Sequence, residues 1–118
     1  MGCLPYLKFY PGDWLSDRKV RDMTPEGRGL YFDLLCVAWQ EGAIPDPPLE
    51  LASYLRIPSK RFARIWDREV AGYWVHGPKG MLVNPRQEQE RGKAETIYQQ
   101  RVEAGRKGGR PTANGRPS

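Results

Sequence analysis

The apolar side chains of this chain stop well before its end, and this limits where a core can form. All but one of the aromatic residues lie before His76, and from Glu103 to Ser118 there is no Leu, Ile, Val, Met or aromatic residue. Such a segment cannot bury enough apolar surface to offset the entropy of ordering it. We therefore predict a folded domain over residues 1–85, a polar helix over 86–102 and a flexible basic tail over 103–118. The core is expected to form around Trp14, Tyr31, Trp39, Phe62, Trp66 and Trp74.

The clearest helix of the folded domain begins at Thr24. Thr24 can cap free amide groups, Pro25 fits the first helical position, and Glu26 suits the positive end of the helix dipole. Apolar residues then recur at three- and four-residue spacing, and Gly42 ends the helix. The earlier segment Tyr6–Tyr10 mixes aromatic residues with one Lys and predicts a short strand, which a Pro-Gly turn ends.

Two shorter helices follow, over about residues 49–55 and 60–70, and Ser59 is expected to cap the second of them. At about 100° per residue, the second helix places its apolar residues on one side and four cations on the other. Two such helices joined by a Pro-Ser corner predict a helix–turn–helix, with the second in the place of a recognition helix. The alternative is an ordinary helix with a solvated cationic face. The four cations are Lys60, Arg61, Arg64 and Arg68.

A β-hairpin is predicted after these helices. Tyr73–Val75 and Met81–Val83 are β-prone runs separated by five residues, with Lys79 at the tip of the loop. Three helices followed by a hairpin are the element order of a winged helix. We therefore predict a small α+β winged-helix domain, in which the strand over Tyr6–Tyr10 would extend the sheet.

The end of the chain carries most of its charge. Residues 101–118 hold five cations and one acid, Glu103, while the whole chain has a formal net charge of +5. A flexible cationic arm on a small folded body favours a polyanion such as nucleic acid. A solubilising terminus without a ligand is the alternative. The tail cations expected to contact nucleic acid are Arg106, Lys107 and Arg110.

The reactive residues are too sparse to indicate catalysis. His76 is the only histidine, and no nucleophile elbow, phosphate-binding glycine loop or zinc spacing is present. Cys3 and Cys36 show neither disulfide density nor metal-ligand spacing, and we expect Cys36 to be a buried thiol. We therefore expect no enzyme, no metal and no cofactor. Because no apolar run approaches the roughly twenty residues of a membrane span, and no secretory signal is visible, we expect a cytoplasmic protein without a membrane partner.

Several motifs of the chain form a recognisable pattern. The most specific is Phe9–Asp17, which reads FYPGDWLSD, and others occur at the start and end of the predicted helix 24–42. The pattern resembles the YdaU-like family of phage and prophage proteins, a domain of unknown function. Members of the family are similar to the N-terminal winged-helix domains of phage replisome organisers. The other residues that carry the resemblance are Glu26, Arg28, Gly29, Tyr31, Trp39, Gly42, Pro45, Asp46, Leu82–Asn84, Arg86 and Glu103–Arg110.

The resemblance implies a winged helix that acts in the initiation of phage DNA replication, and two alternatives stay open. One is a small phage-encoded interaction factor or inhibitor, which would bind a host or phage protein through the winged-helix scaffold. The other is a transcriptional regulator. The expected partners are DNA and a replication or host protein, in the cytoplasm of a bacterial host cell. A homodimer is a further expectation, formed through the narrow stripe of Ala94, Ile97, Tyr98 and Val102 on the polar helix.

Overall fold

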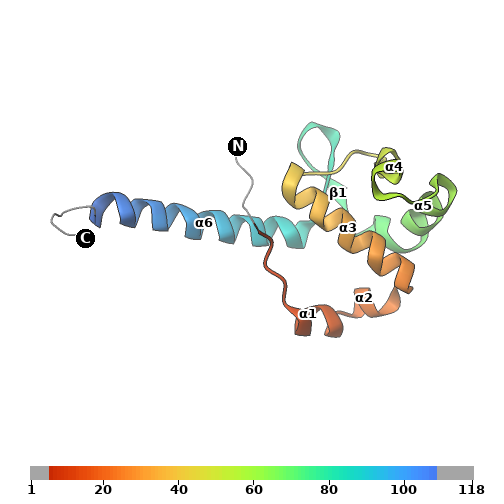
Figure 1. Cartoon of the computed structure of the whole chain (residues 1–118), viewed down its shortest axis with the longest axis horizontal. Coiled ribbons are helices and arrows are strands. Elements are labelled where there is room, and N and C mark those ends of the chain that lie inside the picture. Colours follow the sequence, from red (N-terminus) through yellow and green to blue (C-terminus); the bar gives the residue numbers. More distant parts are fainter. Residues whose placement is uncertain (1–5, 109–118) are drawn as a thin grey trace. The chain divides into compact units, whose positions relative to one another are not determined.

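The computed structural model describes the chain from residue 6 to residue 108, and the side chains of residues 6 to 106. The chain divides into two compact units, Met1–Glu88 and Gln89–Ser118. The first unit is mostly helical and carries one hairpin (Figure 1). Its elements are α1 (Pro11–Ser16), α2 (Arg18–Asp22), α3 (Pro25–Glu41), η1 (Pro48–Leu51), α4 (Ala52–Leu55), α5 (Ser59–Ile65), η2 (Trp66–Val70), η3 (Ala71–Tyr73), β1 (Val75–His76), η4 (Pro78–Gly80), β2 (Leu82–Val83) and the start of α6 (Pro85–Gly108).

Helix α3 forms the centre of the first unit, and both of its predicted ends are confirmed. The Thr24 side chain accepts a hydrogen bond from the Gly27 amide at 3.0 Å, and Pro25 occupies the first helical position. Gly42 ends the helix in the left-handed region at φ 94°, where a residue without Cβ is not strained. Because its apolar residues recur at helical spacing, one face of α3 is buried; on it lie Leu30, Tyr31, Leu34, Ala38 and Trp39.

The two short helices of the predicted helix–turn–helix are present. The first is a 3₁₀ turn, η1, that continues into α4, and the second, α5, begins at Ser59. Arg56 closes α4 in the left-handed conformation at φ 59°, and the Ile57 amide donates back to the Ala52 carbonyl at 2.9 Å. The expectation that Ser59 caps α5 is wrong. Ser59 is already the first helical residue, and no side chain caps this helix.

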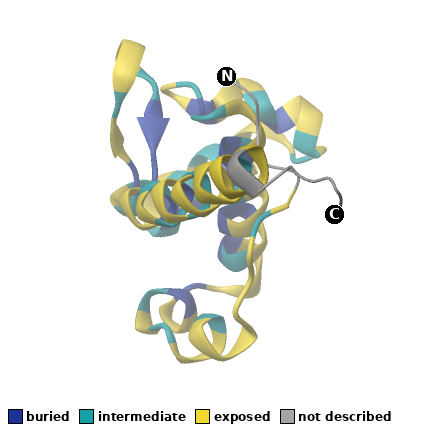
Figure 2. Ribbon diagram, turned by 90° about the vertical axis from the view of Figure 1, so that its left-hand side faces the viewer, coloured by how far each residue is buried: buried dark blue, intermediate teal, exposed yellow. Residues whose placement is uncertain are grey.

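The predicted hairpin is also present, although its strands are shorter than expected. β1 and β2 pair antiparallel, with Val75 opposite Val83 and His76 opposite Leu82. β2 is buried while β1 is exposed, as Figure 2 shows. The outer side of β2 is occupied by Ile44, whose amide donates to the Leu82 carbonyl at 2.9 Å and whose carbonyl accepts from the Leu82 amide at 2.8 Å.

The N-terminal strand was wrongly predicted. Tyr6–Tyr10 has no regular secondary structure. The edge of β2 is taken by Ile44, and the ring of Phe9 packs against Trp14 and Phe32 instead of lying beside a strand. The expected Pro-Gly turn is the start of α1, where Pro11 occupies the first helical position. The short helix α2 was not predicted; Asp17 begins it by accepting a hydrogen bond from the Lys19 amide at 2.9 Å.

The predicted core is confirmed for Tyr31, Trp39, Phe62 and Trp74, which are buried, whereas Trp14 and Trp66 are only partly buried against it. Cys36, expected to be buried, is exposed on α3. In the second unit, α6 continues past the expected end at Val102 as far as Gly108. Gly105 alone does not stop it, and Arg106 pairs with Glu103 one turn earlier at 3.4 Å.

Candidate nucleic-acid interface

Helix α5 separates an apolar face from a cationic one. Its buried residues are Phe62 and Ile65, which belong to the core of the first unit. The four cations predicted to contact nucleic acid, Lys60, Arg61, Arg64 and Arg68, are all exposed. The structure therefore places all four on the solvent side of one helix and its continuation, η2.

Only one of these four cations forms an ion pair within the part of the chain that the structure describes. Arg61 lies 3.8 Å from a carboxylate oxygen of Glu26, and both side chains are more than half exposed. An exposed pair of this kind contributes about 0–1 kcal/mol, so it would yield readily to a phosphate. Lys60, Arg64 and Arg68 have no such pair among the described residues.

The end of the helix departs from the regular geometry that the sequence predicted. Residues Trp66–Val70 form a π-helical turn, with hydrogen bonds five residues apart. A π turn winds the chain less tightly than an α-helix, so Arg68 is shifted around the helix axis from its position in a regular α-helix. π turns inside helices are frequent at functional sites.

The π turn also directs Glu69 toward the start of α3. One Glu69 oxygen accepts from the Thr24 amide at 2.6 Å, and the other accepts from the Thr24 hydroxyl at 2.8 Å. A carboxylate at this position interacts favourably with the positive end of the α3 dipole. We call these hydrogen bonds between Glu69 and Thr24 the tie. It was not predicted from the sequence, because the two residues are 45 positions apart and no local sequence pattern relates them.

The remaining predicted site residues lie on other elements. Lys79 is exposed in the hairpin loop and adopts the left-handed conformation at φ 62°. Arg106 is exposed in the second unit and pairs with Glu103 at 3.4 Å. The side chains of Lys107 and Arg110 lie outside the described residues.

A second exposed surface was not among the predicted sites. The ring of Phe9 lies 5.9 Å from that of Trp14 and 5.8 Å from that of Phe32. Phe9 and Phe32 are exposed, as are the neighbouring Tyr10 and Leu15. We call these five residues the aromatic surface. Its sequence signal was the density of aromatic residues in the FYPGDWL motif.

Asn84 is a buried polar residue that organises the end of the hairpin. Its amide group donates to the Tyr73 carbonyl at 2.9 Å and to the Tyr31 hydroxyl at 3.2 Å. Its side-chain oxygen accepts from the Gln87 amide at 3.0 Å. Asn84 therefore caps α6 in the way that Thr24 caps α3, with a proline following in both cases.

The described residues show no sign of a metal centre or of a membrane segment. Among them, no three His, Cys, Asp or Glu side chains gather in a way that would hold a metal ion. No helix within residues 6–108 has the length and apolar character to cross a bilayer.

These observations define a small α+β domain, mostly helical, with a two-stranded antiparallel hairpin and an exposed cationic helix. The chain is similar to the uncharacterised protein YdaU of Escherichia coli (strain K12), with 34% identity over 65 residues. The similar segment covers 55% of this chain but only 22% of YdaU. No family model and no solved structure matches the chain.

Proposed function

We propose that this chain is a winged-helix DNA-binding protein of phage or prophage origin, which acts in the initiation of phage DNA replication. In this proposal α5 is the recognition helix and the hairpin from β1 to β2 is the wing. The motifs that resemble the YdaU-like family support the phage origin, and the weak similarity to YdaU itself agrees with that resemblance. The order of helices and hairpin supports the winged helix.

The observation that carries the proposal is the exposure of the cations on α5 and η2. Lys60, Arg64 and Arg68 are exposed and have no ion-pair partner within residues 6–106. They can therefore bind a phosphate without first breaking an ion pair to another residue of this chain. Arg side chains can also contact guanine edges in a bidentate way, whereas Lys60 would act mainly as a point charge toward phosphate. Lys79 of the wing, together with Arg106, Lys107 and Arg110, would add phosphate contacts.

The proposal predicts a defined salt dependence. Each neutralised phosphate contributes about 0.9 to the slope of log K against log salt. With four contacts from α5 and η2 and about three from the C-terminal cations, we expect a slope near −6 for duplex DNA. A slope shallower than about −2 would mean that most of these cations do not contact the backbone.

The test compares two double variants by fluorescence anisotropy on labelled duplex and single-stranded DNA. Lys60→Ala with Arg64→Ala should weaken binding at least about tenfold and make the salt slope shallower by about 2. The matched control, Lys8→Ala with Arg18→Ala, removes one exposed Lys and one exposed Arg that lie outside α5 and η2 and form no ion pair within residues 6–106, and it should change both quantities much less. Equal effects of the two double variants would refute α5 as the contact helix.

The aromatic surface favours a second candidate function, the binding of a host or phage protein. Large exposed aromatic side chains are typical anchors of protein interfaces. If the folded chain gave no anisotropy change with any duplex or single strand, this function would replace the first. A transcriptional regulator would use the same DNA-binding surface, and footprinting on promoter and replication-origin fragments would separate the two roles. Self-association through the exposed Ile97 and Tyr98 of α6 stays a prediction.

A further inference from the structure

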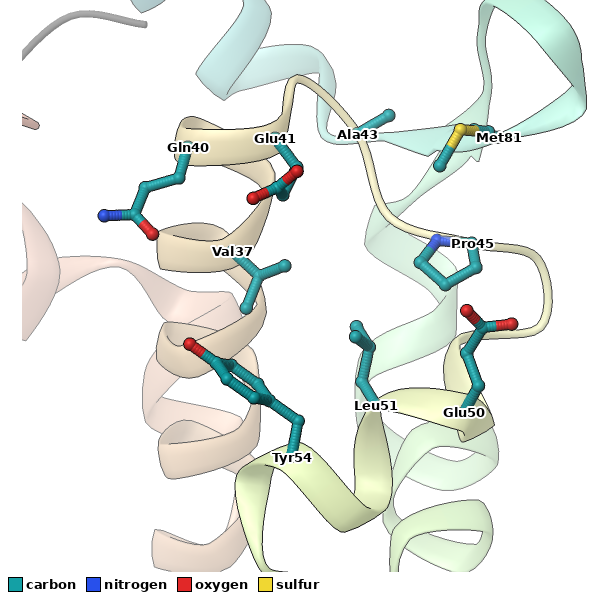
Figure 3. Close-up of a pocket in the computed structure, with 9 residues that line it drawn as sticks. All are labelled: Val37, Gln40, Glu41, Ala43, Pro45, Glu50, Leu51, Tyr54 and Met81. Atoms are coloured by element: carbon teal, nitrogen blue, oxygen red, sulfur yellow. The ribbon is translucent and has the colours of Figure 1, made fainter.

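The first unit contains a groove that none of the proposed DNA contacts uses. It lies between the C-terminal end of α3, the η1–α4 segment and the hairpin (Figure 3). Its volume is about 390 Å³, within the range of roughly 300–1,000 Å³ that is typical of ligand pockets. The lining residues are Val37, Gln40, Glu41, Ala43, Pro45, Glu50, Leu51, Tyr54 and Met81.

The base and walls of the groove are apolar. Figure 3 shows Tyr54 projecting from the η1–α4 segment toward α3, where Val37 lies, and Leu51 projecting into the space beside it. Val37 and Leu51 are partly buried against the core, whereas Tyr54 is 72% exposed. A ring this exposed can accept a cationic side chain over one of its faces.

The charge of the groove is opposite to that of the chain. Glu41 and Glu50 line it and are exposed, while no Lys, Arg or His is among its lining residues. Neither carboxylate forms an ion pair within the described residues. Two unpaired carboxylates beside apolar walls would repel phosphate, which disfavours nucleic acid as the occupant, and would attract a cation with an apolar stem.

We propose that this groove docks a segment of a partner protein that presents one Arg or Lys side chain beside a bulky aliphatic one. The aliphatic side chain lies against Val37 and Leu51, and the cationic stem crosses the Tyr54 ring. The charged head then reaches Glu41 or Glu50. The groove shares no residue with the cationic face of α5, so the proposal does not depend on DNA binding.

The test uses two terminally blocked tripeptides, Leu-Arg-Leu and Leu-Gln-Leu, titrated into the isotopically labelled full chain and followed by amide chemical shifts. Leu-Arg-Leu should shift the amides of the groove residues, with a Kd of about 0.1–1 mM. The uncharged Leu-Gln-Leu should bind at least about fivefold more weakly, because it loses the attraction of both carboxylates.

Matched variants locate the site. Glu41→Gln with Glu50→Gln keeps the side-chain size and should weaken Leu-Arg-Leu about three- to tenfold. Asp22→Asn with Asp67→Asn removes two exposed carboxylates outside the groove and should leave the affinity within about twofold. The proposal is overturned by equal binding of the two peptides, by shifts centred on the aromatic surface, or by no shifts at about 5 mM peptide. DNA affinity, measured in parallel, should not fall in the Glu41/Glu50 variant whichever result the peptides give.

Discussion

Gly27 lies where the first turn of α3 meets Glu69, and replacing it with alanine tests how the two helices are joined. A Cβ at Gly27 would lie only 2.8 Å from the carboxyl carbon of Glu69 and closer still to its Oε1. That oxygen accepts from the Thr24 amide at 2.6 Å, and the same carboxylate accepts from the Thr24 hydroxyl at 2.8 Å. The alanine methyl group would therefore push the carboxylate away from both donors.

The magnitude follows from two opposing effects. A hydrogen bond to a charged group is worth about 1.5–3 kcal/mol, but Thr24 is exposed, so water would replace part of what is lost. Against this, alanine is favoured over glycine in a helix by up to about 1 kcal/mol. We expect Gly27→Ala to lower the free energy of unfolding by about 1–2 kcal/mol, and each kcal/mol lowers Tm by about 4–8 °C in a domain of this size.

Gly29 in the same helix provides the matched control, because no atom lies within 4 Å of the Cβ that would be added there. Gly29→Ala should raise the free energy of unfolding by up to about 1 kcal/mol. Thermal and urea denaturation followed by circular dichroism measure both variants. In a Glu69→Ala background the loss caused by Gly27→Ala should disappear, since the clash has been removed. Equal increases in Tm for the two alanine variants would refute the tie between Glu69 and α3.

Two further predictions concern the corner before α5 and the buried tyrosine. Arg56→Gly should raise the free energy of unfolding by about 0.5–1 kcal/mol in urea titrations, because glycine relieves the left-handed strain at φ 59° but adds chain entropy; a loss of stability would contradict this. Burial raises the pKa of Tyr31 above 10.0. The unfolded chain therefore loses this proton first, so the stability conferred by Tyr31 is complete below pH 10 and is lost as the pH rises above about 10 through the folded pKa. The urea midpoint of Tyr31→Phe should fall less steeply than that of the wild type between about pH 9 and pH 11, and parallel curves would contradict the assignment.

The parts of the fold that local chemistry determines were predictable from the sequence. Thr24 and Pro25 mark the start of α3, Gly42 marks its end, and the spacing of apolar residues gives its buried face. The exposure of the α5 cations followed from helical periodicity in the same way. Asn84 and Pro85 repeat the pattern of a capping residue followed by proline that Thr24 and Pro25 show. The capped start of α6 was therefore predictable from the sequence, although our prediction did not include this cap.

The parts that depend on distant residues were not predictable. Tyr6–Tyr10 has the composition of a strand, but composition does not tell which neighbours a segment meets, and Phe9 packs on Trp14 of α1 and Phe32 of α3. The groove beside Tyr54 likewise needs three elements from different parts of the chain. The sequence shows that residues 41 and 50 are both Glu, but it does not show that they lie close together. Only the packing of α3, η1 and the hairpin brings them to one apolar surface.

The tie between Glu69 and Thr24 connects the stability of the domain to its proposed function. The same five-residue π turn contains both Glu69, which reaches α3, and Arg68, which we propose as a DNA contact. If the tie orients α5, Gly27→Ala should weaken DNA binding as well as stability, although Gly27 is buried and carries no charge. If the packing of Phe62 and Ile65 alone orients α5, the variant should lose stability and keep its DNA affinity at temperatures well below its Tm. Measuring the free energy of unfolding and the DNA affinity of this variant therefore separates the role of the buried face of α5 from that of the Glu69 carboxylate in η2.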